Sequence, residues 1–408
     1  MNSHKKDFPI FKNYPKLVYL DNAATSQKPQ SVINAISHYY ENSCANVHRG
    51  VHNLSDVSTT VFETSKENVA KFFGAKNTEL ILTRNATEAL NGMVYGWAEN
   101  NLKEGDVILV SLMEHHANIV PWQELGKRIE THLNYIPLTT EGLLDLDDLE
   151  KKITKYGNKI KLISLAHVSN TLGTVSPIKK IIALIKKHKL DCKISLDGAQ
   201  SAPHMKINFA KLGVDFYSFS GHKMLGPMGI GGLIVKEELL KTEEMKPWLF
   251  GGGMIDSVYK DKTKFNDDLS ERFIAGTPDV ASIAGLSAAC DYLGKIGMDN
   301  VENHDRDLIR YTLKKLSQIN EVKIIGPLDA KYRLGSVAFI YKGVHAHDVA
   351  QVLNGENVAV RSGHHCTMPL HVENKWMASV RASFSVYNSK DDIDQLIKAI
   401  KKIKTIFK

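Results

Sequence analysis

The chain has 408 residues, of which 43% are hydrophobic and 24% are charged. This composition is typical of a globular protein with a large core, and the length favours one large domain with a smaller one. The net charge of +7 is spread along the chain, and no run reaches five consecutive basic residues. We therefore expect Lys401, Lys402 and Lys404 to lie on a solvated helix face and predict no nucleic-acid partner.

The cysteines and the N-terminus indicate a reducing compartment. No two of the four cysteines form a CxxC pair, which argues against a zinc knuckle or a disulfide framework. The N-terminus is polar from its first residues, and no apolar stretch approaches the length of a membrane span. We expect a soluble, cytoplasmic protein with no membrane partner, unless a targeting segment has been removed.

Short apolar runs alternate with helical patterns between about residues 75 and 235. Strands are predicted at 80–83, 107–111, 133–137, 161–165, 194–197, 216–218 and 232–235, and helices at 87–97, 122–130, 146–153 and 178–188. This alternation predicts an α/β fold whose large domain has a mostly parallel seven-stranded sheet, covered by helices on both faces. The last two runs follow each other closely, which predicts an antiparallel edge.

The chain after residue 250 predicts a mobile loop or hairpin and then a second unit. Three glycines at 251–253 and a polar stretch to about 266 indicate the loop or hairpin. Helices at 280–293 and 301–319 follow. Strands at 322–325, 337–340, 358–361 and 380–384, with helices at 347–353 and 391–406, predict a small α+β domain.

We predict three parts: residues 1–30 as an N-terminal segment, 31–295 as the large cofactor-binding domain, and 296–408 as the small domain. Within the N-terminal region, residues 18–21 and 31–40 are both expected to pack on the small domain.

One lysine and one aspartate have the properties of a pyridoxal 5'-phosphate (PLP) site. Lys223 lies in Ser220-Gly221-His222-Lys223-Met224, and Asp197 precedes it by one short strand and loop. A lysine forms a Schiff base with an aldehyde cofactor, and a buried aspartate can keep a pyridine nitrogen protonated, so that the ring acts as an electron sink. The pair therefore predicts PLP as the cofactor.

Polar residues follow several of the predicted strands, where open parallel sheets bind their ligands. Residues 83–88 end a strand and open a helix, so the amides of Ala86 and Thr87 could bind a phosphate. The alternative is a plain N-cap by Asn85 or Thr87.

Three further strand ends carry candidate residues. His115 and His116 follow one strand, and because neighbouring histidines rarely point the same way, at most one is expected to face the site; a structural role is the alternative. Asn170 follows the strand predicted at 161–165 and Gln200 follows the one at 194–197, and the Asn170 amide could reach the phenolic oxygen of the cofactor.

These motifs resemble the class V (fold type I) PLP-dependent aminotransferase family, and closely its SufS-type, group II cysteine desulfurases. The resemblance covers essentially the whole chain, and its motifs are residues 20–24, 47–50, 114–122 and 361–366. It implies that Lys223 holds PLP, that Asp197 pairs with the pyridine nitrogen and that Gln200 bonds the phenolic oxygen. It further implies that His115 stacks on the ring and has a catalytic role as a proton relay.

The resemblance also implies a phosphate site shared by two subunits. Thr87, Ser220 and His222 would hold the phosphate, and Thr277 would reach the phosphate of the neighbouring subunit in a homodimer. The family often has a hydroxyl residue at the position of Ala86, so a side-chain contact is absent there while an amide contact remains possible.

A second cluster suggests the fate of the substrate. By resemblance, Arg381 clamps the α-carboxylate of L-cysteine, Asn170 and His48 complete the pocket, and Arg361 lies near it. Cys366 would attack the substrate sulfur as a thiolate and carry it as a persulfide, leaving L-alanine. His364, His365 and Cys366 could also be interpreted as a metal site, but adjacent ligands chelate poorly and we predict no metal.

The loop of residues 361–369 leaves little slack for Cys366 to travel. Group II enzymes of this kind rely on a small sulfur-acceptor protein of the SufE or SufU type, and the resemblance implies one here, for iron–sulfur cluster assembly. A selenocysteine lyase or a cysteine sulfinate desulfinase shares nearly the whole site and stays an alternative. A class V transaminase would have no use for Cys366. A non-catalytic PLP-binding or sulfur-carrier scaffold is a further alternative, and what argues against it is the intact set of Lys223, Asp197, His115, Arg381 and Cys366.

Overall fold

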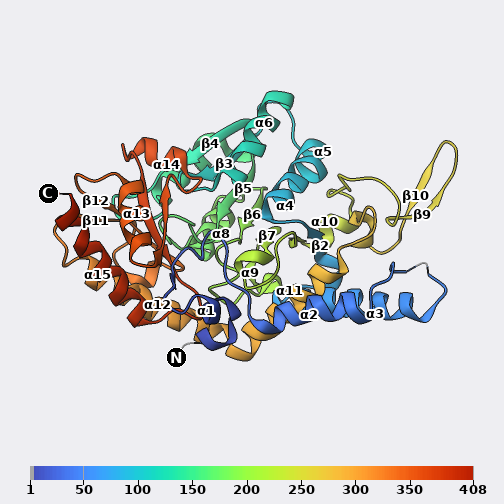
Figure 1. Ribbon diagram of the computed structural model, residues 1–408. Helices are drawn as coiled ribbons and strands as arrows, with labels where there is room; N and C mark the ends of the chain where they lie inside the picture. Colours follow the sequence, from blue (N-terminus) through green and yellow to red (C-terminus); the bar gives the residue numbers. More distant parts are fainter. Residues whose placement is uncertain (1–3, 49, 408) are drawn as a thin grey trace.

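The computed structural model describes residues 4–48 and 50–407. It contains a seven-stranded sheet, a four-stranded sheet and two short two-stranded ones. Figure 1 shows the C-terminal helix α15 (Lys390–Ile406) at one end of the molecule. The hairpin of β9 (Ile255–Val258) and β10 (Thr263–Phe265) projects from the other end, so the hairpin interpretation of residues 251–266 is confirmed.

The large sheet has the predicted strands in a crossed order. In space they run β2 (Leu80–Thr83), β8 (Gly231–Val235), β7 (Phe216–Ser220), β6 (Lys193–Asp197), β5 (Ile160–Ala166), β3 (Val107–Ser111) and β4 (His132–Ile136). Strands β7, β6, β5, β3 and β4 pair in parallel, whereas β8 is antiparallel to both of its neighbours. The predicted mostly parallel sheet is therefore confirmed. The expectation that the antiparallel strand lies at the edge is wrong, because β2 adds outside β8.

Both faces of the large sheet are buried, which explains why its strands are continuous apolar runs. On β3, Val107 and Leu109 join one apolar cluster, and Ile108 and Val110 join another on the opposite face. The helices that cover the faces are α4 (Ala86–Met93) and α6 (Val120–Ile129) on one side, and α7 (Leu146–Tyr156) and α8 (Ile178–Lys187) on the other.

The N-terminal region is divided between the two sheets. Strand β1 (Val18–Tyr19) pairs in parallel with β13 (Val358–Ala359), so residues 18–21 pack on the small unit as expected. Helix α2 (Gln30–Asn42) instead packs with α3 (Asn53–Phe72) against α11 (Val280–Ile296). The expectation for residues 31–40 is therefore wrong. An amphipathic pattern shows that a helix has a partner but does not say which one.

The second unit is an antiparallel sheet with helices. Its strands run in the order β11 (Val322–Ile325), β12 (Ser336–Tyr341), β15 (Ser379–Ser383) and β14 (Arg361–Gly363). Its helices are α12 (Met298–Leu316), α13 (Ala346–Gly355), α14 (Met368–Glu373) and α15. The single strand expected at 358–361 is in fact two short strands, β13 and β14, which pair with different partners.

Among the described residues the remaining α-helices are short, and they are α1 (Pro9–Asn13), α5 (Glu99–Asn101), α9 (Phe209–Leu212) and α10 (Glu237–Lys241). No helix within residues 4–48 and 50–407 is long and apolar enough to cross a bilayer. The domain boundaries after residues 30 and 295 stay a prediction.

Candidate active site

A cavity of about 290 Å³ lies where the parallel strands of the large sheet end. Strand β2 ends at Thr83, β3 at Ser111, β5 at Ala166, β6 at Asp197 and β7 at Ser220, and the pairing places these ends at one edge of the sheet. Twelve of the fourteen predicted site residues line the cavity: Ala86, Thr87, His115, Asn170, Asp197, Gln200, Ser220, His222, Lys223, Arg361, Cys366 and Arg381.

Lys223 and Asp197 reach the cavity from neighbouring strands. Asp197 ends β6 beside Ser218 of β7, and Lys223 follows β7 in a single 3-10 turn. Burial raises the pKa of Asp197, and it lowers the pKa of Lys223 to about 8. Within the described part of the chain the two form no direct ion pair, although both line the same cavity, so space remains between amine and carboxylate.

The start of helix α4 lines the cavity. The Asn85 side chain accepts the Glu88 amide at 3.0 Å, so Asn85 is the N-cap. The Ala86 amide donates to Ser220 Oγ at 2.9 Å. The Ala86 amide is thus already bonded, which differs from the expectation that it would be available to a phosphate. The exposed Thr87 is therefore the candidate phosphate ligand that is left at this helix start.

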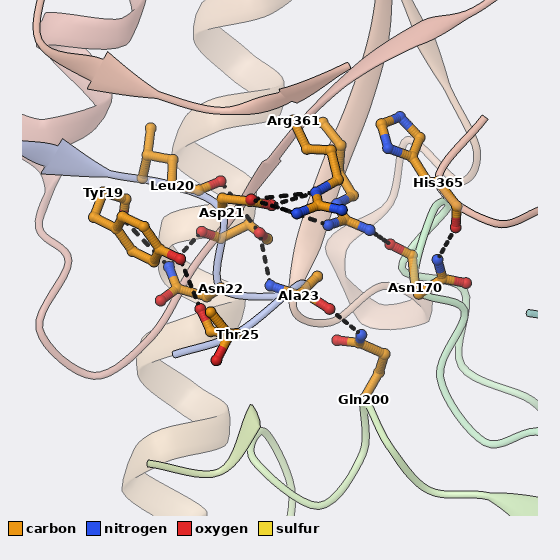
Figure 2. Close-up of polar contacts among 12 residues, drawn as sticks. Tyr19, Leu20, Asp21, Asn22, Ala23, Thr25, Asn170, Gln200, Arg361 and His365 are labelled. Atoms are coloured by element: carbon orange, nitrogen blue, oxygen red, sulfur yellow. Dashed lines mark hydrogen bonds and ion pairs between the residues drawn. The ribbon is translucent and has the colours of Figure 1, made fainter. Parts of the chain in front are cut away.

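His222 and Gln200 both line the cavity, and both are bonded to the N-terminal segment. The pKa of His222 is lowered to about 4, first by burial and then by Lys223 and Lys28. The Lys28 amine donates to the His222 carbonyl at 2.9 Å, which fixes the backbone just before Lys223. Gln200 donates to the Ala23 carbonyl at 2.8 Å, so the N-terminal segment forms part of the same wall (Figure 2).

A buried polar chain explains the sequence around His115. The Glu114 carboxyl accepts from Asn118 Nδ2 at 2.7 Å and from Ser111 Oγ, and Asn118 Oδ1 accepts from Trp122 Nε1 at 3.1 Å. Burial raises the pKa of Glu114 to about 7. These contacts rigidify the turn that carries His115, whose Nδ1 accepts the Ala117 amide at 3.0 Å.

The two adjacent histidines point to different places. His115 lines the cavity, and burial together with Lys223 lowers its pKa to about 3, so its ring is neutral. His116 instead holds the loop of Cys366. Its amide donates to the Cys366 carbonyl at 2.8 Å, and its Nε2 accepts the Met368 amide at 3.0 Å.

Asp21 forms ion pairs with both arginines of the site, and it was not predicted as a site residue from the sequence. Arg361 Nε lies 3.2 Å from each Asp21 carboxylate oxygen, and Arg381 Nη2 lies 3.2 Å from Oδ1 (Figure 2). Arg381 is 2% exposed, its Nη1 donates to the Asn170 carbonyl at 3.0 Å, and burial lowers its pKa to about 10. The motif of residues 20–24 contained Asp21, but only the fold brings it within reach of residues 340 and 360 positions away.

The loop of Cys366 crosses the cavity mouth with an uncommon backbone. Both His365 and Cys366 have positive φ angles, 51° and 58°, a region that non-glycine residues rarely adopt. Asn170 donates to the His365 carbonyl at 2.7 Å (Figure 2). Cys366 is exposed and lines the cavity, whereas the buried His365, also part of its wall, was not predicted there.

His48 and Thr277 do not lie at this cavity. They line a separate hollow of about 380 Å³ beside the β9–β10 hairpin, where Thr277 Oγ1 lies 3.4 Å from Asn46 Oδ1. Across the described residues, no group of three or more His, Cys, Asp or Glu side chains is arranged to bind a metal.

The chemistry of the cavity fits PLP. An amine of lowered pKa and a buried carboxylate line it without an ion pair between them, and a helix N-terminus with Thr87, Ser220 and His222 lines it too. A buried guanidinium, that of Arg381, is also part of its wall.

The fold and this lysine–aspartate arrangement define a PLP-type transferase, and the sequence agrees. Residues 18–396 match the aminotransferase class-V family, so the chain belongs to this family. The family predicted from the motifs is therefore confirmed at this level, while the group II subtype stays a prediction.

Individual relatives and solved structures that the chain resembles share one more specific name, cysteine desulfurase. The chain is 45% identical to proteins of Halalkalibacterium halodurans and Staphylococcus aureus that are named probable cysteine desulfurase, over 100% of this chain and 99% and 97% of theirs. It resembles the apo structure of the cysteine desulfurase of Thermococcus onnurineus NA1, with a TM-score of 0.93 and 38% identity over 100% of this chain and 99% of that one. It also resembles the cysteine desulfurase CsdA of Escherichia coli, with a TM-score of 0.88 and 33% identity over 98% of both chains.

Proposed function

We propose that the protein is a PLP-dependent cysteine desulfurase, which converts L-cysteine to L-alanine and takes up the sulfur on Cys366 as a persulfide. The observation that carries the proposal is one cavity lined by Lys223, Asp197, Arg381 and an exposed cysteine. The names of the relatives agree with it.

Cofactor binding would use the residues at the strand ends. Lys223 would hold PLP covalently, Asp197 would bind the pyridine nitrogen and Gln200 the phenolic oxygen. Thr87, Ser220 and His222 would bind the phosphate, and the neutral ring of His115 would stack on the cofactor. When bound, PLP supplies an electron sink for the substrate carbon that loses its proton.

Substrate binding would use the arginines. Nη1 and Nη2 of Arg381 carry four N–H groups. One donates to the Asn170 carbonyl and one to the Asp21 carboxylate, so two remain for the α-carboxylate of the substrate. Asn170 and Arg361 would orient the same group. The Asp21 carboxylate keeps the half-exposed Arg361 directed into the site before substrate arrives.

Lys223 would move the protons of the reaction. Because its pKa is lowered to about 8, a larger fraction of this amine is neutral near neutral pH than of an exposed lysine, and the neutral amine can take up the α-proton of the substrate. It then returns a proton during the formation of alanine.

Cys366 would accept the sulfur. Its thiolate attacks the substrate sulfur, a sulfur–sulfur bond forms, and the carbon–sulfur bond breaks. The bonding electron pair stays with the three-carbon fragment, which is protonated to L-alanine. The products are therefore alanine and a Cys366 persulfide, with no external oxidant or reductant.

A separate sulfur acceptor is part of the proposal. The backbone on both sides of Cys366 is held by Asn170 and His116, so the persulfide has little freedom to travel. A small acceptor protein of the SufE or SufU kind would approach it, in the cytoplasm, and pass the sulfur to iron–sulfur cluster assembly.

The test is alanine release from L-cysteine with a reductant present, comparing the wild type with Cys366→Ala. We expect alanine from the wild type and a loss on the order of 100-fold or more in the variant, because the nucleophile is removed. Equal release from both proteins would contradict the role of Cys366.

The same assay with L-selenocysteine separates the alternative. Selenium leaves more readily than sulfur, so a selenocysteine lyase would keep most of its activity in Cys366→Ala. A cysteine sulfinate desulfinase would keep most of its activity in Cys366→Ala when L-cysteine sulfinate is supplied as the substrate.

A further inference from the structure

A closed network of buried hydrogen bonds lies beneath the loop of Cys366. His371 of α14 and Ser379 of β15 are both fully buried. His371 Nε2 and His365 Nε2 each lie 3.0 Å from the same atom, Ser379 Oγ. The Ser379 hydroxyl therefore connects the two imidazole rings.

Carbonyl oxygens fix the direction of each bond. His371 Nδ1 lies 3.1 Å from the Thr367 carbonyl, and His365 Nε2 lies 3.1 Å from the Ser379 carbonyl. Because a carbonyl only accepts, we assign a proton to both nitrogens. A neutral His371 then has an unprotonated Nε2, which accepts the Ser379 hydroxyl proton. The same hydroxyl oxygen shares the one His365 Nε2 proton with the Ser379 carbonyl, and burial, which lowers the pKa of both histidines, keeps them neutral.

The network ends at the residues that flank the proposed nucleophile. His365 precedes Cys366 in the left-handed turn, and Thr367 follows it, bonded through Oγ1 to Thr171 at 3.0 Å. A turn with two consecutive non-glycine residues at positive φ persists only where its surroundings hold it. The hydrogen bonds of the His365 ring go to Ser379, so the orientation of this large side chain depends on the Ser379–His371 pair.

We propose that His371 is a positioning residue for the sulfur transfer: through Ser379 it fixes the His365 ring and thereby the left-handed turn that presents Cys366 to the cavity. The inference rests on the proposed function in that it takes Cys366 as the nucleophile. A histidine that only fills space beneath the loop would not need its Nε2 lone pair.

Three substitutions of His371 separate these roles. The amide of glutamine reaches the place of Nε2 and can accept from Ser379, whereas the shorter amide of asparagine reaches the place of Nδ1 and can donate only to Thr367. Methionine fills the space and makes neither bond. We therefore expect His371→Gln to rescue what His371→Asn and His371→Met lose.

The measurements are the rate of iodoacetamide alkylation of Cys366 in the holoenzyme, from mass spectra of its peptide, and kcat and KM for L-cysteine. In His371→Met and His371→Asn we expect the alkylation rate of Cys366 and kcat each to change by about tenfold. The KM for L-cysteine should stay within about twofold of the wild-type value, because a displaced nucleophile affects the sulfur transfer and not the binding of the carboxylate. In His371→Gln both rates stay within about threefold of the wild type. His188→Met, which removes a histidine that is hydrogen-bonded to Glu150 and does not line the cavity, serves as the control with unchanged rates.

A second variant covers the case in which a His371 protein does not fold. Ser379→Ala removes the connecting hydroxyl and should reproduce the His371→Met effects, and the double variant should be no worse than either single one. Equal behaviour of the glutamine and asparagine variants, or full additivity of the double variant, would overturn the proposal. If wild-type protein releases no alanine, the proposed function fails, while the alkylation ranking still tests the network.

Discussion

Burial shifts the pKa values of several residues in the cavity wall in the direction that favours their neutral form. It lowers the pKa of Lys223 to about 8 and that of His115 to about 3, and it raises the pKa of Asp197. Fixed positive charge is concentrated at Arg381 and Arg361, which share the single carboxylate of Asp21. The two guanidiniums and one carboxylate leave a net positive charge, which supports the proposed binding of an α-carboxylate there.

The lowered pKa of Lys223 predicts the pH dependence of cofactor binding. Only the neutral amine attacks the PLP aldehyde, and an amine of lowered pKa becomes neutral at lower pH. The rate at which cofactor-free protein binds PLP should therefore rise as the pH passes through about 8, well below the range of an exposed lysine. The visible absorbance of the bound cofactor measures this rate.

An Asp197→Asn variant provides the control. The Asp197 charge raises the pKa of Lys223 against the effect of burial, so its removal should move the inflection to lower pH. An inflection near that of free lysine in both proteins would show that the amine is not buried as described.

At the level of elements, the site depends on how closely the chain just beyond β6 approaches β7. Gly198 follows Asp197 and donates its amide to the Ser218 carbonyl at 2.7 Å. A Cβ atom at this position would lie 2.0 Å from the ring of Tyr217, which is fully buried and bonded to Ser201. Since neither strand can retreat, a glycine is required where the chain leaves β6.

Gly198→Ala should therefore both destabilise the fold and displace Asp197. We expect the free energy of unfolding to fall by about 1–3 kcal/mol, as for other overpacked cores, and the affinity for PLP to fall with it. Urea unfolding and cofactor titration measure the two effects.

Gly294→Ala is the matched control for this prediction. Gly294 lies within helix α11, and a Cβ atom added there would meet open space, with no described atom outside its own stretch of helix within 4 Å. Alanine at this position should therefore raise the free energy of unfolding by about 0.5–1 kcal/mol. A Gly198→Ala protein as stable as the wild type would contradict the close approach.

Helices and strands were predictable from the sequence where a single local pattern determines their type and position. The strands of the large sheet have apolar runs because both faces are buried, and their ends fell within a few residues of the prediction. Long-range choices were not predictable. Nothing near β8 shows that β2 adds outside it, and nothing in α2 shows that its apolar face meets α11.

The same distinction applies to the site. Lys223 and Asp197 are recognisable because their chemistry is unusual and their sequence separation is short. Asp21 and His371 are ordinary residues whose importance comes only from contacts made across the fold, with Arg381 and Ser379 respectively. Such contacts between separate elements are set by packing and leave no local signal.

For the whole molecule, the separation of Thr277 from the cavity bears on the predicted homodimer. Thr277 and His48 line their own hollow beside the projecting hairpin, so within one chain Thr277 does not contribute to the site that contains Lys223. If Thr277 binds the phosphate of a neighbouring subunit, each complete site needs residues from two chains.

Mixing two inactive variants tests this arrangement. Lys223→Ala removes the amine from a chain that keeps Thr277, and Thr277→Glu places a negative charge against the phosphate while keeping Lys223. Each homodimer should be inactive, but a mixed dimer has one site that combines the intact Lys223 of one chain with the intact Thr277 of the other. Equal mixing, after unfolding and refolding together, gives mixed dimers in about half of the molecules, so about a quarter of the wild-type desulfurase activity should return. No recovery in mixtures that sedimentation shows to be dimeric would mean that each chain completes its own site, because in that case every site in the mixture carries one of the two substitutions.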